Sequence, residues 1–188
     1  DWDDEKIKKD LLTSIKIFKN KLGYSPKIFS YPFGEYSSNL KKIVSDLNFE
    51  YAFGQHSGVI DPTKDFLELP RFPINEKYGE IKRFKSILKT LPFPYENITP
   101  ENRYLKKDEN PPKVKIKFFK NLINIQNINC YSNEGNIWRK SDIQFINENE
   151  LMILLKEKFK SERGRINCSL WKESGKWRWL GIQYVIAE

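Results

Sequence analysis

The sequence has almost no histidine and little cysteine, and each shortage excludes a class of site. Among 188 residues there is one histidine, His56, and there are two cysteines, Cys130 and Cys168. A single histidine excludes metal sites within this chain that need two, such as H-x-x-H. Two cysteines are too few for a zinc ribbon or finger. No hydrophobic run approaches 18 residues, so we expect no membrane span.

The chain also lacks an initial methionine and a basic, apolar leader. We therefore expect either a processed protein or a piece of a longer one. Hydrophobic residues make up 39% of the chain and aromatic residues 14%, which is enough to build a core and excludes a disordered protein.

The net charge of +8 invites a nucleic-acid partner, but its distribution argues against one. Residues 1–94 carry 16 basic and 13 acidic groups, and residues 95–188 carry 17 and 12. Lysine (26) far outnumbers arginine (7). An evenly spread, lysine-rich charge is typical of a solvated surface, so we expect no nucleic-acid partner.

Residues 1–94 show helical and strand patterns in alternation. Apolar spacing predicts helices over residues 4–22 and 79–91 and another that begins at Ser37 or Ser38. Short apolar runs predict strands over residues 27–31, 49–53 and 66–74. Alternation of this kind favours parallel strands and an α/β fold. Three strands leave an open sheet edge, so we expect the second half of a larger α/β domain.

The pattern changes after residue 94. Five prolines between residues 92 and 112 predict a linker over 95–112. Beyond it, a period of two predicts a small antiparallel all-β domain over 113–188. The last two strands, 165–171 and 177–186, flank a turn at 173–176. The other predicted strands cover 114–118, 125–131, 142–146 and 151–155, with a helix over 151–159 as an alternative to the last.

Three segments of the first half are candidates for chemistry. The first, residues 29–36, reads F-S-Y-P-F-G-E-Y. A strand that ends in this corner places the following backbone N–H groups at the carboxyl end of the sheet, where ligands bind in α/β proteins. The alternative is a rigid turn with buried aromatic rings.

The second and third segments contribute one titratable and one charged side chain. His56 follows a predicted strand and is either a general acid or base or a surface residue between two glycines. Arg71 lies in L-P-R-F-P at residues 69–73. It either holds a catalytic carboxylate or reaches solvent from an edge strand.

These segments, in this order and spacing, resemble polysaccharide deacetylases of the NodB-homology type, over residues 1 to about 91. The resemblance implies a distorted (β/α) barrel and a hydrolase that removes acetyl groups, usually N-acetyl groups, from a polysaccharide. It implies that the amide of Phe33 stabilises the oxyanion, that Arg71 orients the catalytic base and that His56 assists protonation of the leaving amine. The corner residues Tyr31, Pro32, Gly34 and Tyr36 are then expected to contact substrate.

One departure from the family pattern dominates the interpretation. The family holds a divalent, zinc-like metal with an Asp and an H-x-x-H pair, and this chain has neither T-F-D-D nor H-x-x-H. We therefore expect a fragment that binds no metal and is inactive alone, with its missing N-terminal half as partner. The resemblance also implies a periplasmic or extracellular location.

The tail leaves two questions open. Cys130 and Cys168 lie in predicted strands and either form a disulfide across the sheets or remain buried thiols. Trp177 and Trp179 alternate onto one face and either stack on sugar rings or pack against the barrel. If they bind sugar and no metal half exists, the chain is a non-catalytic glycan-binding module, the alternative to a deacetylase.

Overall fold

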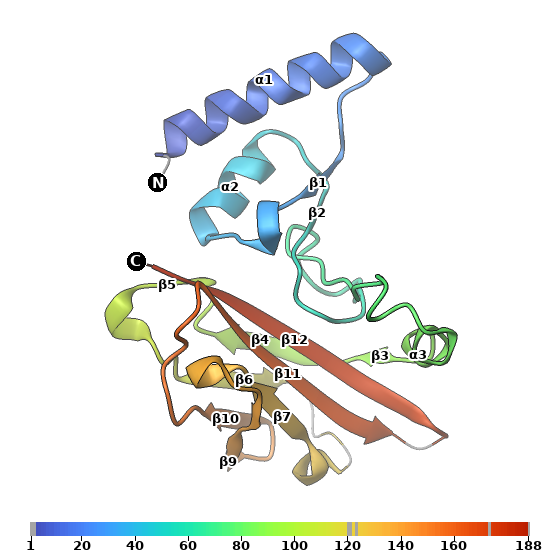
Figure 1. Cartoon of the computed structure of the whole chain (residues 1–188), viewed down its shortest axis with the longest axis vertical. Helices are drawn as coiled ribbons and strands as arrows, with labels where there is room; N and C mark the ends of the chain where they lie inside the picture. The colour runs from blue at the N-terminus through green and yellow to red at the C-terminus, as the bar shows by residue number, and fades with distance from the viewer. Residues whose placement is uncertain (1–2, 120–121, 123, 173, 188) are drawn as a thin grey trace.

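The computed structural model describes residues 3–119, 122, 124–172 and 174–187. It divides into an N-terminal region, residues 3–87, and a β region, residues 91–187 (Figure 1). The N-terminal region contains α1 (Asp4–Leu22), β1 (Ile28–Ser30), η1 (Pro32–Gly34), α2 (Ser38–Asp46), β2 (Tyr51–Phe53) and α3 (Ile81–Ile87). The strands of the β region are β3 (Leu91–Pro92), β4 (Tyr95–Thr99), β5 (Tyr104–Leu105), β6 (Val114–Phe118), β7 (Asn129–Ser132), β8 (Arg139–Lys140), β9 (Asp142–Asn147), β10 (Glu150–Leu154), β11 (Arg163–Lys172) and β12 (Lys176–Ile186). Its single turns of 3₁₀ helix are η2 (Lys107–Glu109), η3 (Ile125–Asn127) and η4 (Glu134–Asn136).

The first two helices begin at side-chain caps. The carboxylate of Asp3 accepts a hydrogen bond from the backbone N–H of Lys6 at 2.7 Å, and α1 ends at Gly23, whose φ is 83°. The hydroxyl of Ser37 accepts from the backbone N–H of Leu40 at 3.1 Å and caps α2. These contacts satisfy N–H groups that no intrahelical carbonyl can reach.

The predicted parallel pairing is confirmed for β1 and β2, whose residues align from Ile28 opposite Tyr51 onward. The strand predicted over 66–74 is wrong, because Leu69 alone forms a bridge there, parallel to Phe53. Pro70 and Pro73 lack the N–H groups that a strand needs, so the ladder stops. The described residues form no closed barrel, so the half-barrel remains a prediction.

The third helix is shorter than the pattern predicted. It covers Ile81–Ile87 rather than 79–91, because Glu80 has extended backbone angles and Leu91 pairs with β12. Two of its apolar residues face solvent, with Ile81 66% and Phe84 41% exposed. Apolar spacing therefore identified the helix but not the face that is covered.

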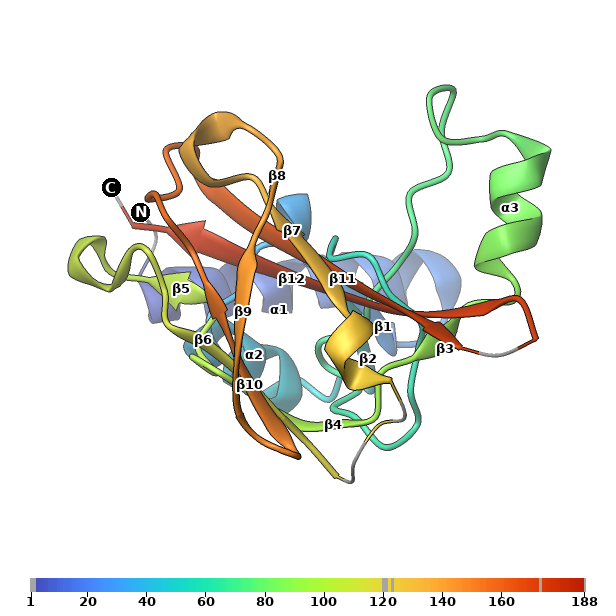
Figure 2. The same cartoon turned by 90° about the horizontal axis from the view of Figure 1, so that it is seen from below.

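The β region consists of two sheets. One has the antiparallel order β4-β6-β10-β9, and the other has the order β3-β12-β11-β7-β8, with β5 also paired to β12. Figure 2 shows the two sheets crossing over one another, with α3 standing to one side. Residues of β6 alternate between buried and exposed, so Val114, Ile116 and Phe118 face inward and the intervening lysines face outward. The predicted period of two is confirmed here.

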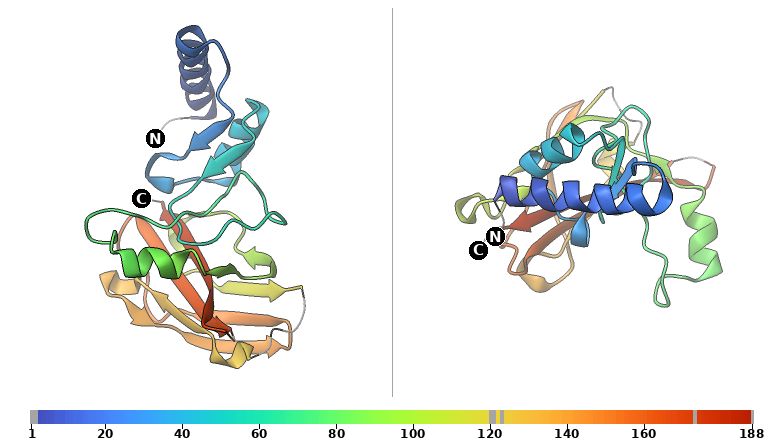
Figure 3. Two further views of the ribbon diagram at one scale, coloured as in Figure 1. Left: turned by 90° about the vertical axis from the view of Figure 1, so that its right-hand side faces the viewer. Right: turned by 90° about the horizontal axis from the view of Figure 1, so that it is seen from above.

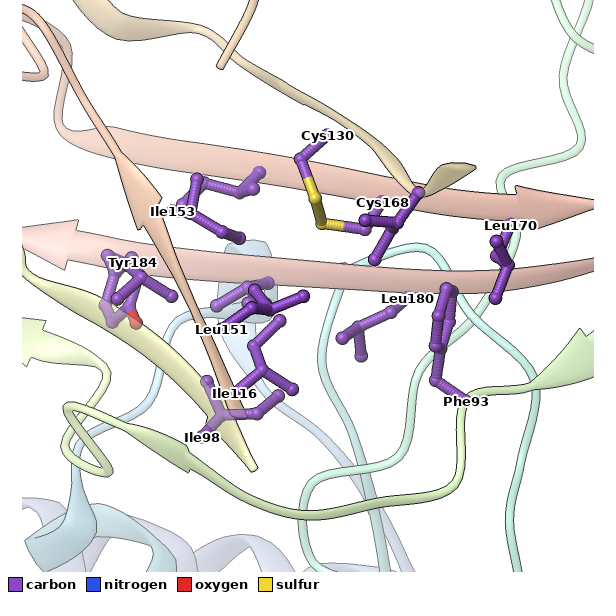
Figure 4. Close-up of a cluster of buried hydrophobic side chains, with 14 of the residues drawn as sticks. Phe93, Ile98, Ile116, Cys130, Leu151, Ile153, Cys168, Leu170, Leu180 and Tyr184 are labelled. Atoms are coloured by element: carbon purple, nitrogen blue, oxygen red, sulfur yellow. A yellow bond between two sulfur atoms is a disulfide. The ribbon is translucent and has the colours of Figure 1, made fainter. Parts of the chain in front are cut away.

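One hydrophobic core lies between these sheets (Figure 4). It takes Ile116 and Leu151 from the first sheet and Ile166 and Tyr184 from the second, each at most 1% exposed. The close-up also shows the disulfide between Cys130 and Cys168. These residues lie directly opposite one another on β7 and β11, so the bridge joins neighbouring strands of one sheet rather than two sheets.

Several predicted boundaries in the β region change. The segment 95–112 contains β4 and β5 rather than only a linker, because these strands pair with β6 and β12. Residues 150–154 form the strand β10, and the helical alternative over 151–159 is wrong. The strand predicted over 125–131 begins only at Asn129, after η3. The hairpin of β11 and β12 is confirmed, although Glu173 of its turn lies outside the described residues.

The described helices include none that is long and apolar enough to cross a membrane. Figure 3 shows α1 at the end of the molecule farthest from the β region, with α2 and the β1–β2 pair between them. The β12 strand lies on the side of the β region that faces the N-terminal region (Figure 1). The carboxyl ends of β1 and β2 therefore meet the β region.

Candidate functional site

The corner after β1 has an unusual backbone. Phe33 has a φ of 55° and Gly34 a φ of 72°. Positive φ is rare for a bulky residue and costs on the order of 1–3 kcal/mol, so the surrounding structure must hold it in place. A Cβ on Gly34 would collide with the backbone nitrogen of Gln55, which explains why glycine is needed at this position.

This backbone leaves one donor available. The N–H of Gly34 bonds to the carbonyl of Tyr31 at 2.8 Å, and the N–H of Glu35 bonds to the carbonyl of Pro32 at 3.0 Å. Among the backbone hydrogen bonds between described residues, none uses the N–H of Phe33. Phe33 as a residue is 65% exposed, so the corner lies at the surface. Such a donor suits an anion that forms outside the corner.

Residues of the β region contact this corner and fix its position. The side-chain amide of Gln183 on β12 donates to the carbonyls of Phe33 and Gly34, both at 3.3 Å. Glu35 forms an ion pair with Arg163 on β11, whose guanidinium also lies 4.9 Å from the Phe33 ring centroid. The strained turn is therefore fixed by contacts with residues 128 to 150 positions later in the chain.

The two tyrosines of the corner lie in the core. Tyr31 is 1% exposed and Tyr36 is 6% exposed, and their rings stack with centroids 4.9 Å apart. The hydroxyl of Tyr31 donates to the carbonyl of Leu67 at 2.9 Å. Burial raises the pKa of both hydroxyls above the ordinary value, so they stay neutral. The expectation that these rings contact substrate does not match their burial, whereas Pro32 and Phe33 are exposed.

His56 occupies the loop after β2, as predicted, but in a form that differs from the expected one. The ring is half-buried, and its Nδ1 atom is fully enclosed without a hydrogen-bond partner in the described part of the chain. Burial and the nearby Arg103 guanidinium lower the pKa of His56 to about 3. The ring is therefore neutral at neutral pH and keeps a single N–H, and its role in protonating a leaving amine remains a prediction.

Arg71 lies beside His56 but is not buried. Its backbone N–H donates to the carbonyl of His56 at 3.0 Å, and its side chain is exposed. The ion pairs found among described residues include none with Arg71. Arg71 reaches solvent, from a loop over residues 66–74 rather than from an edge strand, and its role in holding a catalytic carboxylate remains a prediction.

An arginine that the sequence pattern missed is buried instead. Arg103 is 8% exposed, donates to the carbonyl of Pro100 at 2.8 Å and lies 3.9 Å from a carboxylate oxygen of Glu68. Together with His56 these groups line a cavity of about 40 Å³, which suits water rather than a sugar ring. Nothing about an arginine within a proline-rich segment indicates burial, so the sequence held no signal for this cluster.

The tryptophans of the last hairpin have different environments. The ring of Trp179 packs against Phe72, with centroids 6.1 Å apart, so it contributes to the seam between the two regions. Gly181 lies against the backbone of Ser57 in the same seam, and Gly58 bridges to Leu180. Trp177 is 40% exposed and packs edge-to-face on Trp171 at 5.0 Å.

An open groove of about 670 Å³ runs past Arg71 along the seam. We call it the arginine groove. It lies between the 71–83 segment and the outer face of β11 and β12. The residues that line it are Gln55, His56, Ser57, Arg71, Phe72, Pro73, Ile74, Tyr78, Arg83, Trp138, Arg165, Asn167, Trp179 and Ile182.

The described residues do not form a site for a metal ion. Among the described residues, no three His, Cys, Asp or Glu side chains lie close enough together to hold one. The one enclosed imidazole nitrogen, Nδ1 of His56, faces the positive charge of Arg103 rather than a cluster of carboxylates. The site in this chain is thus an amide donor beside an arginine-lined groove.

Comparison with known proteins supports the resemblance for the first part of the chain. Residues 1–52 match the family model described as Polysaccharide deacetylase. No curated protein is significantly similar to the chain. The matched stretch includes the corner at Phe33 and ends within β2. The comparison thus supports the resemblance over the first 52 residues, which hold the corner but neither His56 nor Arg71.

Proposed function

We propose that the chain is the C-terminal part of a metal-dependent deacetylase that removes N-acetyl groups from a polysaccharide. The observation that carries this proposal is the corner at Phe33. It lies within the stretch that matches the family, its N–H is unused by backbone partners among described residues, and its φ of 55° is held by the β region.

The chemistry of amide hydrolysis explains why such a donor is useful. Water adds to the acetyl carbon, the carbonyl oxygen becomes an oxyanion, and the carbon–nitrogen bond breaks as the amine takes up a proton. An N–H that already points at the developing oxyanion stabilises it without reorganisation, and one such donor contributes roughly 3–4 kcal/mol. Phe33 provides this donor from a backbone that Gln183 keeps rigid.

Arg71 is a positioning residue in this proposal. Its guanidinium is exposed on the open side of the loop beside His56 rather than paired within the described chain. A free guanidinium binds a carboxylate in a forked geometry. We assign it the orientation of a catalytic carboxylate from the preceding half of the domain.

That preceding half would also supply the metal ligands, an Asp and an H-x-x-H pair. The surface around β1 supports an apolar partner of this kind. Ile28 is 62% exposed, Tyr51 is 39% exposed and Ile17 of α1 is 56% exposed. An open β1 edge and uncovered apolar side chains are typical of a sheet that continues into further strands.

The disulfide supports a location outside the cytoplasm. Cys130 and Cys168 are bonded, and bonds of this kind persist in oxidising compartments. We propose a periplasmic or extracellular site of action, where polysaccharides are accessible.

Two measurements test the proposal. The coding sequence upstream of Asp1 should encode in-frame T-F-D-D and H-x-x-H motifs. The product of that longer reading frame should release acetate from penta-N-acetylchitopentaose, lose activity with EDTA and regain it with Zn²⁺, whereas residues 1–188 alone should release none. An unrelated upstream sequence, or no acetate release from the longer product on any acetylated glycan, would overturn it.

Variants of the longer protein then test which residues take part in catalysis. Gly34→Ala, which distorts the corner, and Arg71→Ala, which leaves the fold intact, should each lower kcat at least tenfold in the longer protein. Lys113→Gln removes an exposed charge from the β region and should leave kcat unchanged. If the kcat of Gly34→Ala equals that of Lys113→Gln, the corner is excluded from catalysis. If the kcat of Arg71→Ala equals it as well, the positioning role of Arg71 is excluded too.

A non-catalytic glycan-binding module is the second candidate. It is favoured by the exposed pair Trp171 and Trp177 at the end of the hairpin, which offers aromatic surface to a sugar. Binding of a neutral glycan that is lost in Trp177→Ala, together with no acetate release from the longer product, would favour this function instead.

A further inference from the structure

The arginine groove has a charge that the rest of the chain does not share. Three of the chain's seven arginines line it, namely Arg71, Arg83 and Arg165, and no aspartate or glutamate does. The whole sequence has 25 acidic residues against 33 basic ones, so a lining of this size without a carboxylate is a local departure.

The three guanidinium groups keep their charge available. Arg165 donates from Nε to the amide oxygen of Gln183 at 3.1 Å, and Arg83 donates to the carbonyls of Pro73 and Tyr78 at 2.9 and 2.8 Å. These partners are neutral, and the ion pairs found in the described part of the chain involve none of the three arginines. The nearby carboxylate of Glu35 already pairs with Arg163.

The groove also has flat aromatic walls. Trp138 is 51% exposed and Tyr78 is 39% exposed, and they lie on the two sides, one in the β region and one in the 71–83 segment. The guanidinium of Arg83 lies 5.2 Å from the Tyr78 ring centroid and keeps that wall in place. Exposed rings of this kind stack on the apolar faces of sugars, and the side-chain amides of Gln55 and Asn167 suit hydroxyl groups.

The volume and the position fit an extended ligand. About 670 Å³ lies within the range of small-molecule sites and accommodates several sugar rings. The N-terminal region contributes His56 and Arg71 to the lining, and the β region contributes Trp138 and Arg165. Gln55, which also lines the groove, lies against Gly34, so a chain bound in the groove lies beside the corner.

We propose that the arginine groove binds an acidic glycan, a saccharide chain whose rings carry carboxylate or phosphate groups. Arg83 and Arg165 pair with the anionic groups, joined by Arg71 in residues 1–188 alone, where the preceding half supplies no carboxylate for it to orient. The aromatic walls hold the rings. As the substrate of the corner, this glycan depends on the proposed deacetylase function, but its binding to this chain does not. The groove would then select acidic over neutral polysaccharides.

Binding to residues 1–188 tests the inference without turnover. Isothermal titration in 50 mM and 300 mM NaCl would compare tetragalacturonate, a glycerol-phosphate oligomer with sugar substituents, tetra-N-acetylchitotetraose and a single-stranded oligonucleotide. We expect one of the two acidic saccharides to bind at least tenfold more tightly than the neutral tetramer, and more weakly at high salt. Which of them binds identifies the acidic group.

Variants connect the binding to the groove. Arg165→Gln and Arg71→Gln should each weaken binding about tenfold, as expected for one charge-assisted hydrogen bond. Trp138→Ala should weaken it without changing the salt dependence. Lys113→Gln, which removes the same charge elsewhere, should have no effect. Thermal unfolding of each variant confirms that it folds, and Arg71 is exposed enough for its variant to keep the fold.

Three results would overturn the inference. These are equal affinity for neutral and acidic saccharides, binding that Arg71→Gln and Arg165→Gln leave unchanged, and tighter binding of the oligonucleotide than of either acidic saccharide. Absence of acetate release from the longer protein would count against the proposed function alone, because the titration involves no catalysis. An active deacetylase with no affinity for acidic saccharides would overturn the groove alone.

Discussion

The two regions of this molecule differ in how much they bury. Among the residues that the structure describes, the β region has a core of seventeen buried hydrophobic residues, whereas the N-terminal region has a cluster of five. None of the 19 residues of α1, all of which the structure describes, is buried. Both regions have well-formed hydrogen-bonded elements, so secondary structure alone does not distinguish them. The β region is therefore stabilised by its own core, whereas the N-terminal region buries far less apolar surface.

Removing the disulfide should give the largest difference in stability between the two regions. It closes a loop of 38 residues, for which chain entropy predicts a stabilisation of about 4 kcal/mol. The double variant Cys130→Ala with Cys168→Ala should lower the unfolding free energy of the β region by about that amount in urea. The helical signal of α1 should change far less. A midpoint that stays constant would mean that the bridge contributes nothing to the β region.

Matched truncations in the two regions should differ next most. Ile116 is fully buried in β6, so Ile116→Ala should cost about 3 kcal/mol by removing packed atoms from the core. Ile17 of α1 is 56% exposed, and Ile17→Ala should cost within about 0.5 kcal/mol. Urea unfolding followed by tryptophan fluorescence measures both. Equal costs would mean that α1 is covered in solution.

Acid should weaken the seam between the regions through His56. The unfolded chain has the ordinary histidine pKa of about 6.5. In the folded chain, burial and Arg103 lower the pKa to about 3. As the pH falls below about 6.5 the unfolded state takes up a proton that the folded state does not, so stability falls by up to about 1.4 kcal/mol per pH unit.

His56→Gln isolates this effect, since glutamine does not titrate. Between pH 6.5 and 5 the variant should lose less stability than the parent chain, as measured by thermal unfolding at each pH. Parallel curves would show that the imidazole is not enclosed. Stability of the parent above pH 7 should be insensitive to this group.

The smallest expected effect concerns the start of α2. Ser37→Ala removes the hydroxyl that accepts from the N–H of Leu40 and should cost about 1 kcal/mol. Ser38→Ala alters the neighbouring exposed serine at the first helical position and should cost less. Amide exchange of α2 in the two variants separates them. A larger effect of Ser38→Ala would contradict the observed cap.

The parts of the fold that could be predicted are those specified by local chemistry. The alternation in β6, the long β11–β12 hairpin and the cap of α1 each follow from residues within a few positions of one another. The β4 and β5 strands could not be predicted, because β5 pairs with residues about 80 positions away and prolines surround both. The proline content of this segment predicted a linker, but pairing with distant strands makes part of it β-structure.

The candidate site divides in the same way. The corner at Phe33 was predictable because Pro32 and Gly34 specify a tight turn after a strand. The pairing of the two cysteines was left open until register placed them opposite one another. The neutral state of His56, the burial of Arg103 and the shared groove depend on contacts between the regions, which local sequence does not encode.

The hold of Gln183 on the corner has a consequence for how the protein is made. The carbonyl of Phe33 accepts a hydrogen bond from Gln183, a residue of β12 that is synthesised 150 residues later. At a synthesis rate of about 5–20 residues per second, roughly 8–30 s pass between the two. In the nascent chain, the N–H of Phe33 is therefore not yet held in position. The corner reaches its final geometry only after the β11–β12 hairpin has been synthesised and has packed against it.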